Sequence, residues 1–502
     1  MDMPPPSGRL RSSLPTLVIL ALASLAFANA AVYISYASNP FVISDGWYFV
    51  DAFLQKYYNG GVTLTDLYMK RSADDHAQPI HKLLLIWNAD TFSLDFVIES
   101  YMGLAIAAVA WLLMLFVVRQ DNREHGTGAW WMLLPMVAAA ASLVSLSGGM
   151  AFNWSLVTLS YLGPLSMVML AMAAWQAAER NRWLPILVIA PLVLFTMDGT
   201  ALICAISATC ALALRELKLR GKSWRSTSAA LVVIVVAAIG YRLASHYYLH
   251  TYIASTHAGP STVHTLLAFG PEQLLKMVLS IAALSVSDRP LLQHVFPRKA
   301  ELLHLLLGAA VVVAHGWFWW RAVRDRWNQS QFIAVTLMLF CYGAAAGIVL
   351  TRVPVFGPGY VSQQRYLLMY QLGTVALALM AAGADWRTWQ LPQRGIVALV
   401  LAGVVMLQFP LTYATWREAP YVQAWGNTIG RQIILLGHDP AAQLARCEPM
   451  LTVCKASRAE RVRSIELLRT HHLNAFSNRV LNRHSMQSLK ADPGPAELVP
   501  AP

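Results

Sequence analysis

Runs of about 20 apolar residues recur along this chain, and they constrain its fold more than any other feature, because a helix of that length crosses a bilayer. Only 13% of the 502 residues are charged, against about 25% in soluble domains. The runs lack the period-two alternation of a membrane β-barrel. We therefore predict an all-α, polytopic integral membrane protein with about eleven transmembrane helices, at residues 14–36, 96–118, 129–147, 156–178, 183–197, 199–214, 228–245, 301–320, 331–350, 365–382 and 395–414.

Three apolar segments need separate interpretation. The fifth and sixth runs are short and meet at Met197-Asp198-Gly199, which predicts two short helices joined by a tight turn. Residues 271–287 are too short to cross and should lie along the surface. Ala28-Asn29-Ala30 resembles a signal-peptidase site, but the apolar run continues through Ile34, which favours an uncleaved anchor.

Basic residues near the ends of the runs predict the orientation, because they favour the cytoplasmic side. If residues 271–287 do not cross, all the clusters fall on one side, which places the N-terminus in the cytoplasm and the C-terminus outside. The net charge of +12 then reflects basic loops beside an anionic leaflet, and nothing indicates a nucleic-acid partner. The clusters are Arg9 and Arg11, Arg119 and Arg123, Arg180 and Arg182, residues 215–225, residues 321–326, and Arg387 and Arg394.

This topology divides the chain into a transmembrane domain, an outer segment and a tail. The transmembrane domain covers residues 1–414 and includes two large outer loops, 37–95 and 246–300. Residues 415–485 form a small outer C-terminal segment, and residues 486–502 are predicted to be disordered. Cys447 and Cys454 lie in the outer segment, where they can form a disulfide, although two free thiols are the alternative.

The first outer loop carries most of the candidate chemistry. After Asp45, aromatic and aliphatic residues recur at spacings of three and four up to Tyr58, which predicts an amphipathic helix in the membrane interface. Ser44 can cap this helix, Asp45 falls in its first turn and Asp51 follows one turn after Trp47. A second interfacial helix should begin at Pro79.

Acidic residues and a histidine precede the second interfacial helix, in the sequence Asp74-Asp75-His76-Ala77-Gln78-Pro79. Carboxylates and imidazole can hold a divalent metal, but this group does not require one, and we predict no cofactor. A solvated turn before a proline-started helix is the alternative interpretation. The basic loops on the cytoplasmic side contain no nucleotide-binding glycine motif, so an activated lipid-linked substrate fits the chain better.

The layout, an acidic residue early in the first outer loop followed by interfacial helices, resembles the bacterial GT-C glycosyltransferases. Asp74-Asp75-His76-Ala77-Gln78-Pro79 looks like their acidic-His-containing segment, and Gln363-Gln364-Arg365-Tyr366 looks like the Ser-Arg-Tyr segment that opens a late span. Leu473-Asn474-Ala475-Phe476 is similar to part of their outer tail. Gln364 replaces the serine, and Asp-Asp-His replaces a Glu-Xaa-His version.

The resemblance implies transfer of a monosaccharide from a polyprenyl-phosphate donor to an outer-face cell-envelope glycan or glycolipid, in a bacterial inner membrane. Inversion at the anomeric carbon needs a base, and Asp45 is our candidate for this catalytic role. Substrate-binding candidates are Asp51, Asp74, Asp75, His76, Gln364, Arg365 and Tyr366, with Arg365 suited to the donor phosphate.

Each of these residues also has a purely structural interpretation. Asp45 can interact with the helix dipole, Asp51 can lie on a solvated face and Arg365 can snorkel at the end of a span. Among functions, a transporter or flippase of lipid-linked substrates would predict internal repeats and charged or broken helices at mid-membrane. An O-antigen ligase or polymerase would place its large loop later in the chain.

Overall fold

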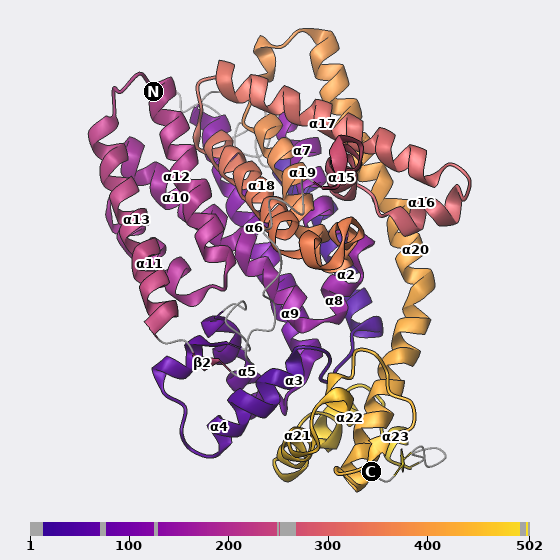
Figure 1. Cartoon of the computed structure of the whole chain (residues 1–502). Coiled ribbons are helices and arrows are strands. Elements are labelled where there is room, and N and C mark those ends of the chain that lie inside the picture. The colour runs from indigo at the N-terminus through magenta and orange to yellow at the C-terminus, as the bar shows by residue number, and fades with distance from the viewer. Residues whose placement is uncertain are drawn as a thin grey trace, which may run out of the picture.

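The computed structural model describes residues 14–70, 77–124, 129–247, 250–251, 268–491 and 498–499. Helices make up nearly all of this described part, as Figure 1 shows, and its strands are two residues long. β1 (Met69–Lys70) pairs in parallel with β2 (His250–Thr251), and β3 (Gln443–Leu444) pairs antiparallel with β4 (Leu498–Val499). The predicted all-α class is confirmed.

Ten of the described helices are long and apolar enough to cross a membrane, which shows a multi-pass membrane protein that associates with a lipid bilayer. Three of them are extended by 3-10 turns: α7 by η3 (Ala129–Met132) and η4 (Leu146–Gly148), α10 by η5 (Leu159–Tyr161), and α19 by η7 (Gln364–Tyr366). The ten are α2 (Leu14–Ala37), α6 (Phe96–Glu124), α7 (Leu133–Leu143), α10 (Leu162–Arg180), α12 (Thr200–Lys218), α13 (Trp224–Tyr247), α17 (Ala300–Arg324), α18 (Gln329–Phe356), α19 (Leu367–Ala382) and α20 (Leu391–His438).

The other elements are shorter and connect or cover the spans. The helices are α3 (Gly46–Tyr48), α4 (Gln55–Tyr58), α5 (Pro79–Phe92), α8 (Met150–Asn153), α9 (Ser155–Thr158), α11 (Leu184–Thr196), α15 (Gly270–Leu284), α16 (Arg289–Val295), α21 (Arg458–Thr470), α22 (Asn478–Arg483) and α23 (Ser488–Ala491). The remaining turns are the π-helix η1 (Phe49–Leu54) and the 3-10 turns η2 (Leu64–Tyr68), η6 (Pro358–Ser362), η8 (Trp386–Thr388), η9 (Thr452–Lys455) and η10 (Asn474–Phe476).

Burial separates central spans from peripheral ones. The apolar stretches of α19 and α7 are 83% and 78% buried within the protein, whereas those of α17 and α20 are 22% and 17% buried. Because lipid solvates apolar side chains without a hydrophobic penalty, the peripheral helices can stay apolar on every face. The bundle is therefore organised around α7, α18 and α19, which contact one another closely or share neighbours.

The predicted pair of short helices is confirmed in outline. α11 ends at Thr196 and α12 begins at Thr200, and the carboxylate of Asp198 between them accepts hydrogen bonds from the amide and hydroxyl of Thr200 at 2.8 and 2.7 Å. α12 extends to Lys218, beyond the predicted end at 214, and has the length of a span. α11 is shorter than a membrane span. The described residues therefore contain ten candidate spans, whereas the sequence predicts about eleven.

The segment predicted to lie along the surface forms α15 and packs against α17. The backbones of the two helices approach so closely that a Cβ built on Gly308 would lie 2.0 Å from the carbonyl oxygen of Leu279. Only glycine tolerates such an approach. This contact fixes the position of α16, which follows α15 and lines a cavity described below.

The last span is much longer than the sequence predicts. α20 contains 48 residues, which is about 70 Å of helix at 1.5 Å per residue, against an apolar bilayer core of about 30 Å. The predicted domain boundary at 414 and 415 thus lies inside a continuous helix. In Figure 1, α20 runs from one end of the bundle to the small helices α21, α22 and α23 at the other.

Those small helices and the first loop cover one end of the bundle, which we call the capped end, where residues 38–58 meet residues 443–484. Asn474 binds the carbonyls of Pro40 and Leu94 through its side-chain nitrogen, at 2.9 and 2.7 Å, and its side-chain oxygen accepts from the Val42 amide. The fully buried carboxylate of Asp95 accepts hydrogen bonds from Arg483 and His484. We call the opposite end, near Arg324 and Gly383, the uncapped end.

The contact between α15 and α17 gives a first prediction. Gly308→Ala should destabilise the protein by roughly 1–3 kcal/mol, because the added methyl group collides with the Leu279 backbone. Gly316→Ala, on the same helix with nothing within 4 Å of the added atom, should be neutral or slightly stabilising. Thermal unfolding of both variants in the same detergent measures the difference, and equal midpoints would contradict the close packing.

Candidate functional site

The predicted site residues separate into three groups in the structure. Asp45 and Asp51 lie in the first loop, against the C-terminal segment. Gln364, Arg365 and Tyr366 form η7 at the start of α19. Asp74, Asp75 and His76 lie outside the described residues. The late segment and the first loop approach different parts of the capped end, so each is described by itself.

The backbone immediately before Asp45 is held from both sides. Ser44 adopts a left-handed conformation with φ of 48°, which is uncommon for a residue other than glycine. Its amide donates a 2.6 Å hydrogen bond to the carbonyl of Met450, and its carbonyl accepts a 2.7 Å hydrogen bond from the Thr452 hydroxyl. These two contacts stabilise a conformation that costs roughly 1–3 kcal/mol in isolation.

The helix after Ser44 differs from the predicted one. Asp45, rather than Ser44, occupies the N-cap position of α3, and its side chain forms no capping hydrogen bond. The helix then passes into the π-turn η1 before α4. Trp47, Val50 and Phe53 are buried within the protein, so the apolar face that the sequence assigns to the membrane interface packs against other helices instead.

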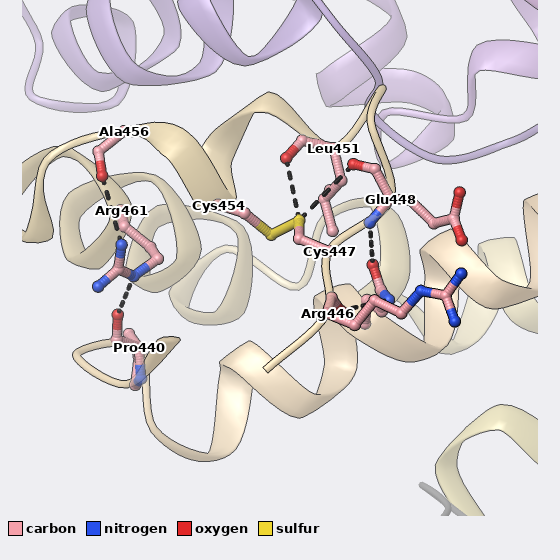
Figure 2. Close-up of a disulfide and its surroundings, with 9 residues drawn as sticks. Pro440, Arg446, Cys447, Glu448, Leu451, Cys454, Ala456 and Arg461 are labelled. Atoms are coloured by element: carbon pink, nitrogen blue, oxygen red, sulfur yellow. Dashed lines mark hydrogen bonds between the residues drawn. A yellow bond between two sulfur atoms is a disulfide. The ribbon is translucent and has the colours of Figure 1, made fainter. Parts of the chain in front are cut away.

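A disulfide closes the segment that holds Ser44. Cys447 and Cys454 are bonded (Figure 2), which decides between the two alternatives that the sequence left open. In the sequence, Met450 and Thr452 lie between these cysteines. The side chain of Gln432 on α20 ties the segment to the bundle, because it accepts from the Glu448 amide and donates to the Arg446 carbonyl. The position of Asp45 therefore depends on a covalently closed turn anchored to α20.

Asp51 also connects the first loop to the C-terminal segment. Its carboxylate is 7% exposed and accepts two hydrogen bonds from Arg463, at 3.2 and 3.1 Å, and one from Ser464 at 3.4 Å. Burial raises the pKa of Asp51, and Arg463 acts in the opposite direction. These contacts give Asp51 a structural role in attaching the C-terminal segment to the first loop.

α5 begins at Pro79 as predicted, but its polar side faces the protein. Lys82 is fully buried, and its ammonium donates to the carbonyls of Leu67 and Met69 at 2.8 Å each. Burial lowers the pKa of the neighbouring His81 to about 4, so this imidazole is neutral at pH 7. Trp87, on the opposite side of the helix, is 43% exposed, which suits a helix lying at the membrane surface.

A cavity of about 340 Å³ lies between α2, α8, α16 and α20 near the capped end. Gln364 lines it, whereas Asp45 and Asp51 do not. The polar groups around it come from segments far apart in the sequence: Tyr33, Asn153, Asp288, His294, Arg417 and Glu418. The cavity thus joins one predicted site residue to several that the sequence did not single out.

Asp288 is the most perturbed acid of this cavity. Its side chain is 7% exposed, and burial, followed by repulsion from Glu418, raises its pKa to about 7. Asn153 donates to the Tyr33 hydroxyl at 3.3 Å, and its side-chain carbonyl oxygen is buried without a hydrogen-bond partner among the described residues. A carboxyl group that titrates near neutral pH, in the same cavity as an unsatisfied acceptor, can bind a hydroxyl-bearing ligand or exchange a proton with it.

Arg365 lies beside the cavity residue Gln364. Its guanidinium stacks against the rings of Tyr360 and Tyr366, 5.4 and 5.1 Å from their centres, and donates to the Tyr360 hydroxyl. The Nε atom is buried without a hydrogen-bond partner in the described structure. Arg365 therefore keeps one donor inside the protein that can bind an anionic group. A snorkelling arginine would direct its donors to water instead.

Sequence reasoning missed Asp288, His294, Arg417 and Glu418. Asp288 directly follows the apolar segment of α15, and Glu418 is an isolated acid just beyond the predicted end of the last span. Both signals were weak, because single acids at the ends of apolar runs are common. Within the described residues no group of three or more His, Cys, Asp or Glu side chains could hold a metal ion.

Comparison with known proteins gives no assignment: no family model, no curated protein and no solved structure matches this chain.

The raised pKa of Asp288 predicts a pH-dependent stability. In the unfolded chain the group ionises near pH 4, so between about pH 4 and 7 the folded protein binds one more proton than the unfolded chain. Stability of the wild type should therefore fall as pH rises through this window, by up to ~1.4 kcal/mol per pH unit, relative to Asp288→Asn.

Thermal unfolding of both proteins at pH 5, 6, 7 and 8 measures this difference. Glu418→Gln removes the repulsion that raises the pKa of Asp288, so it should move the window to lower pH. Parallel pH profiles for the wild type and Asp288→Asn would contradict the assignment.

Proposed function

We propose that the protein is a GT-C-like glycosyltransferase that transfers a monosaccharide from a polyprenyl-phosphate donor to a cell-envelope glycan or glycolipid. The acceptor hydroxyl gives its proton to the Asp45 carboxylate as its oxygen attacks the anomeric carbon. The bond from that carbon to the phosphate oxygen breaks, and the polyprenyl phosphate leaves with the electron pair. The configuration at the anomeric carbon is thereby inverted.

The observation that carries this proposal is the double anchoring of Ser44 beside Asp45. A general base contributes to catalysis only when it is held within hydrogen-bond reach of the proton it removes. The Met450 carbonyl and the Thr452 hydroxyl hold Ser44 in an unfavourable backbone conformation, which fixes where the next residue begins. A connecting loop has no need of such a constraint, whereas a preorganised site does.

The late segment supports the same proposal. The departing polyprenyl phosphate carries negative charge, and the free Nε donor of Arg365 suits one of its oxygens. The adjacent cavity, which Gln364 and Asp288 line, offers hydrogen-bonding groups for a sugar. A polyprenyl tail can lie along the apolar surface of the peripheral helices, which the bilayer surrounds.

The disulfide and the basic loops favour a location at the inner membrane, with the capped end in the periplasm. Disulfides persist in oxidising compartments, and Cys447 and Cys454 lie at the capped end. The basic residues Arg324 and Arg326 lie at the opposite end, where the cytoplasm favours them.

Transport is less well supported than transfer. A transporter of lipid-linked substrates places charged residues near the middle of its spans. In the described residues, the buried Asp, Glu, Lys and Arg lie at the ends of spans or outside them: Asp51, Asp66, Lys82, Asp95, Glu99, Asp121, Arg215, Asp288 and Arg461.

The test is a transfer assay in nanodiscs with a panel of polyprenyl-phosphate sugars and envelope glycolipids. Asp45→Asn should lower the rate at least about 100-fold, because it removes the base. Glu466→Gln, which removes an exposed acid of α21 at the same end, should have no effect.

Two results would count against the proposal. Full activity in Asp45→Asn with loss in Asp288→Asn would assign the base to Asp288. Absence of transfer by the folded wild type from every donor would contradict the transferase itself.

The anchoring of Ser44 predicts that an uncharged residue, Thr452, also affects the transfer rate, but less than Asp45 does. Thr452→Val removes the hydroxyl that binds the Ser44 carbonyl, a bond worth ~1 kcal/mol, so kcat should fall roughly three- to ten-fold with KM unchanged. Thr428→Val, whose hydroxyl bonds within α20 at an exposed position, is the matched control. Equal kcat values for the two variants would show that this contact does not position the base.

A further inference from the structure

A second cavity lies at the uncapped end, opposite the candidate site. Its volume is about 780 Å³, and it opens between the ends of α6, α17, α18 and α19 and the start of α20. Arg321, Arg324, Arg326, Asn328, Gln331 and Gln393 are among the residues that line it. The proposed transfer reaction uses none of them.

Positive charge in this cavity exceeds what its own acids neutralise. Asp325 forms an ion pair with Arg321 at 2.5 Å, and the carboxylate of Asp385 accepts a hydrogen bond from the backbone amide of Arg387. Arg324 and Arg326 form no ion pair with any described residue. Among the described residues, the Nε atom of Arg321 and the Oδ2 atom of Asp325 are both buried without a hydrogen-bond partner. An anion bound here would meet two exposed guanidinium groups and one unsatisfied buried donor.

Trp320 lines the cavity, and Trp389 contacts its residue Arg321. Trp320 lies under the guanidinium groups of Arg321 and Arg324, 5.8 and 5.2 Å away, and Trp389 lies 4.8 Å from that of Arg321. Trp386 stacks against Trp389. Trp320 is 45% exposed, which suits the headgroup region of a membrane because indole is apolar over its rings and polar at its nitrogen, whereas Trp386 and Trp389 are buried within the protein. α17 and α19, two of the candidate spans, end beside this cavity, and the ends of membrane spans lie near the lipid headgroups.

We propose that this cavity binds the phosphate of an anionic phospholipid headgroup. Arginine suits phosphate because its planar fork matches two oxygens at once. The volume is far larger than a phosphate ion requires and accommodates a whole headgroup with its glycerol. The lateral position at the membrane surface favours a lipid over a soluble anion, since a lipid reaches the cavity by diffusion within the leaflet. The site is independent of the proposed transferase activity.

The experiment measures retained lipid by native mass spectrometry of the full-length protein. The protein is released from nanodiscs that contain equal amounts of phosphatidylglycerol and phosphatidylcholine. The wild type should retain phosphatidylglycerol preferentially, and Arg324→Gln combined with Arg326→Gln should reduce this preference about five-fold or more. Arg225→Gln, an exposed arginine of α13 outside the cavity, is the matched control and should retain the wild-type preference.

The other outcomes overturn the proposal. An unchanged preference in the double variant, with the same elution volume and melting temperature as the wild type, would exclude the cavity as the lipid site. Loss of phosphatidylglycerol on addition of millimolar inorganic phosphate at constant ionic strength would identify a soluble anion as the ligand. An equal decrease in Arg225→Gln would show that general surface charge, rather than the cavity, attracts the lipid.

Discussion

Every peptide group of a chain in lipid must find its hydrogen-bond partner within the protein, and the whole structure follows from this constraint. The ten candidate spans satisfy it as helices, which leaves side chains and loops at the two ends to form polar contacts. The buried charges of the described residues lie at those ends. Cavities, ion pairs and the disulfide therefore occur at the ends of the spans, and the proposed functional residues lie there too.

The capped end is built from contacts between the start and the finish of the chain. Asp51 meets Arg463, Asp95 meets Arg483 and His484, and Asn474 satisfies backbone groups of Pro40, Val42 and Leu94. Polar networks of this kind stabilise a structure only when they are complete, because each unpaired buried group is costly. The first loop and the C-terminal segment thus depend on one another, and neither would hold Asp45 in place alone.

Sequence reasoning succeeded where a single local pattern decides the outcome. Apolar length predicted the spans, Pro79 marked the start of α5, and the outer location of two cysteines was compatible with the disulfide that they form. It failed where distant segments combine. The cavity beside Gln364 depends on Asp288 and Glu418, which no local periodicity brings together, and the length of α20 depends on the C-terminal helices that it supports. The roles of Asp45 and Arg365 stay predictions.

α20 is one of the helices that link the two ends, because its residue Gln393 lines the cavity at the uncapped end and its residue Glu418 lines the cavity beside Gln364. A straight helix moves as a rigid rod and cannot by itself make one cavity respond to the other, since coupling requires an element with two arrangements. Pro410 and Pro420 interrupt the hydrogen-bond ladder of α20 beside the acidic cavity. Communication along α20 between a lipid at one end and a substrate at the other therefore requires a change of bend at these prolines, whereas α19, which runs from Gln364 to the uncapped end, contains no proline.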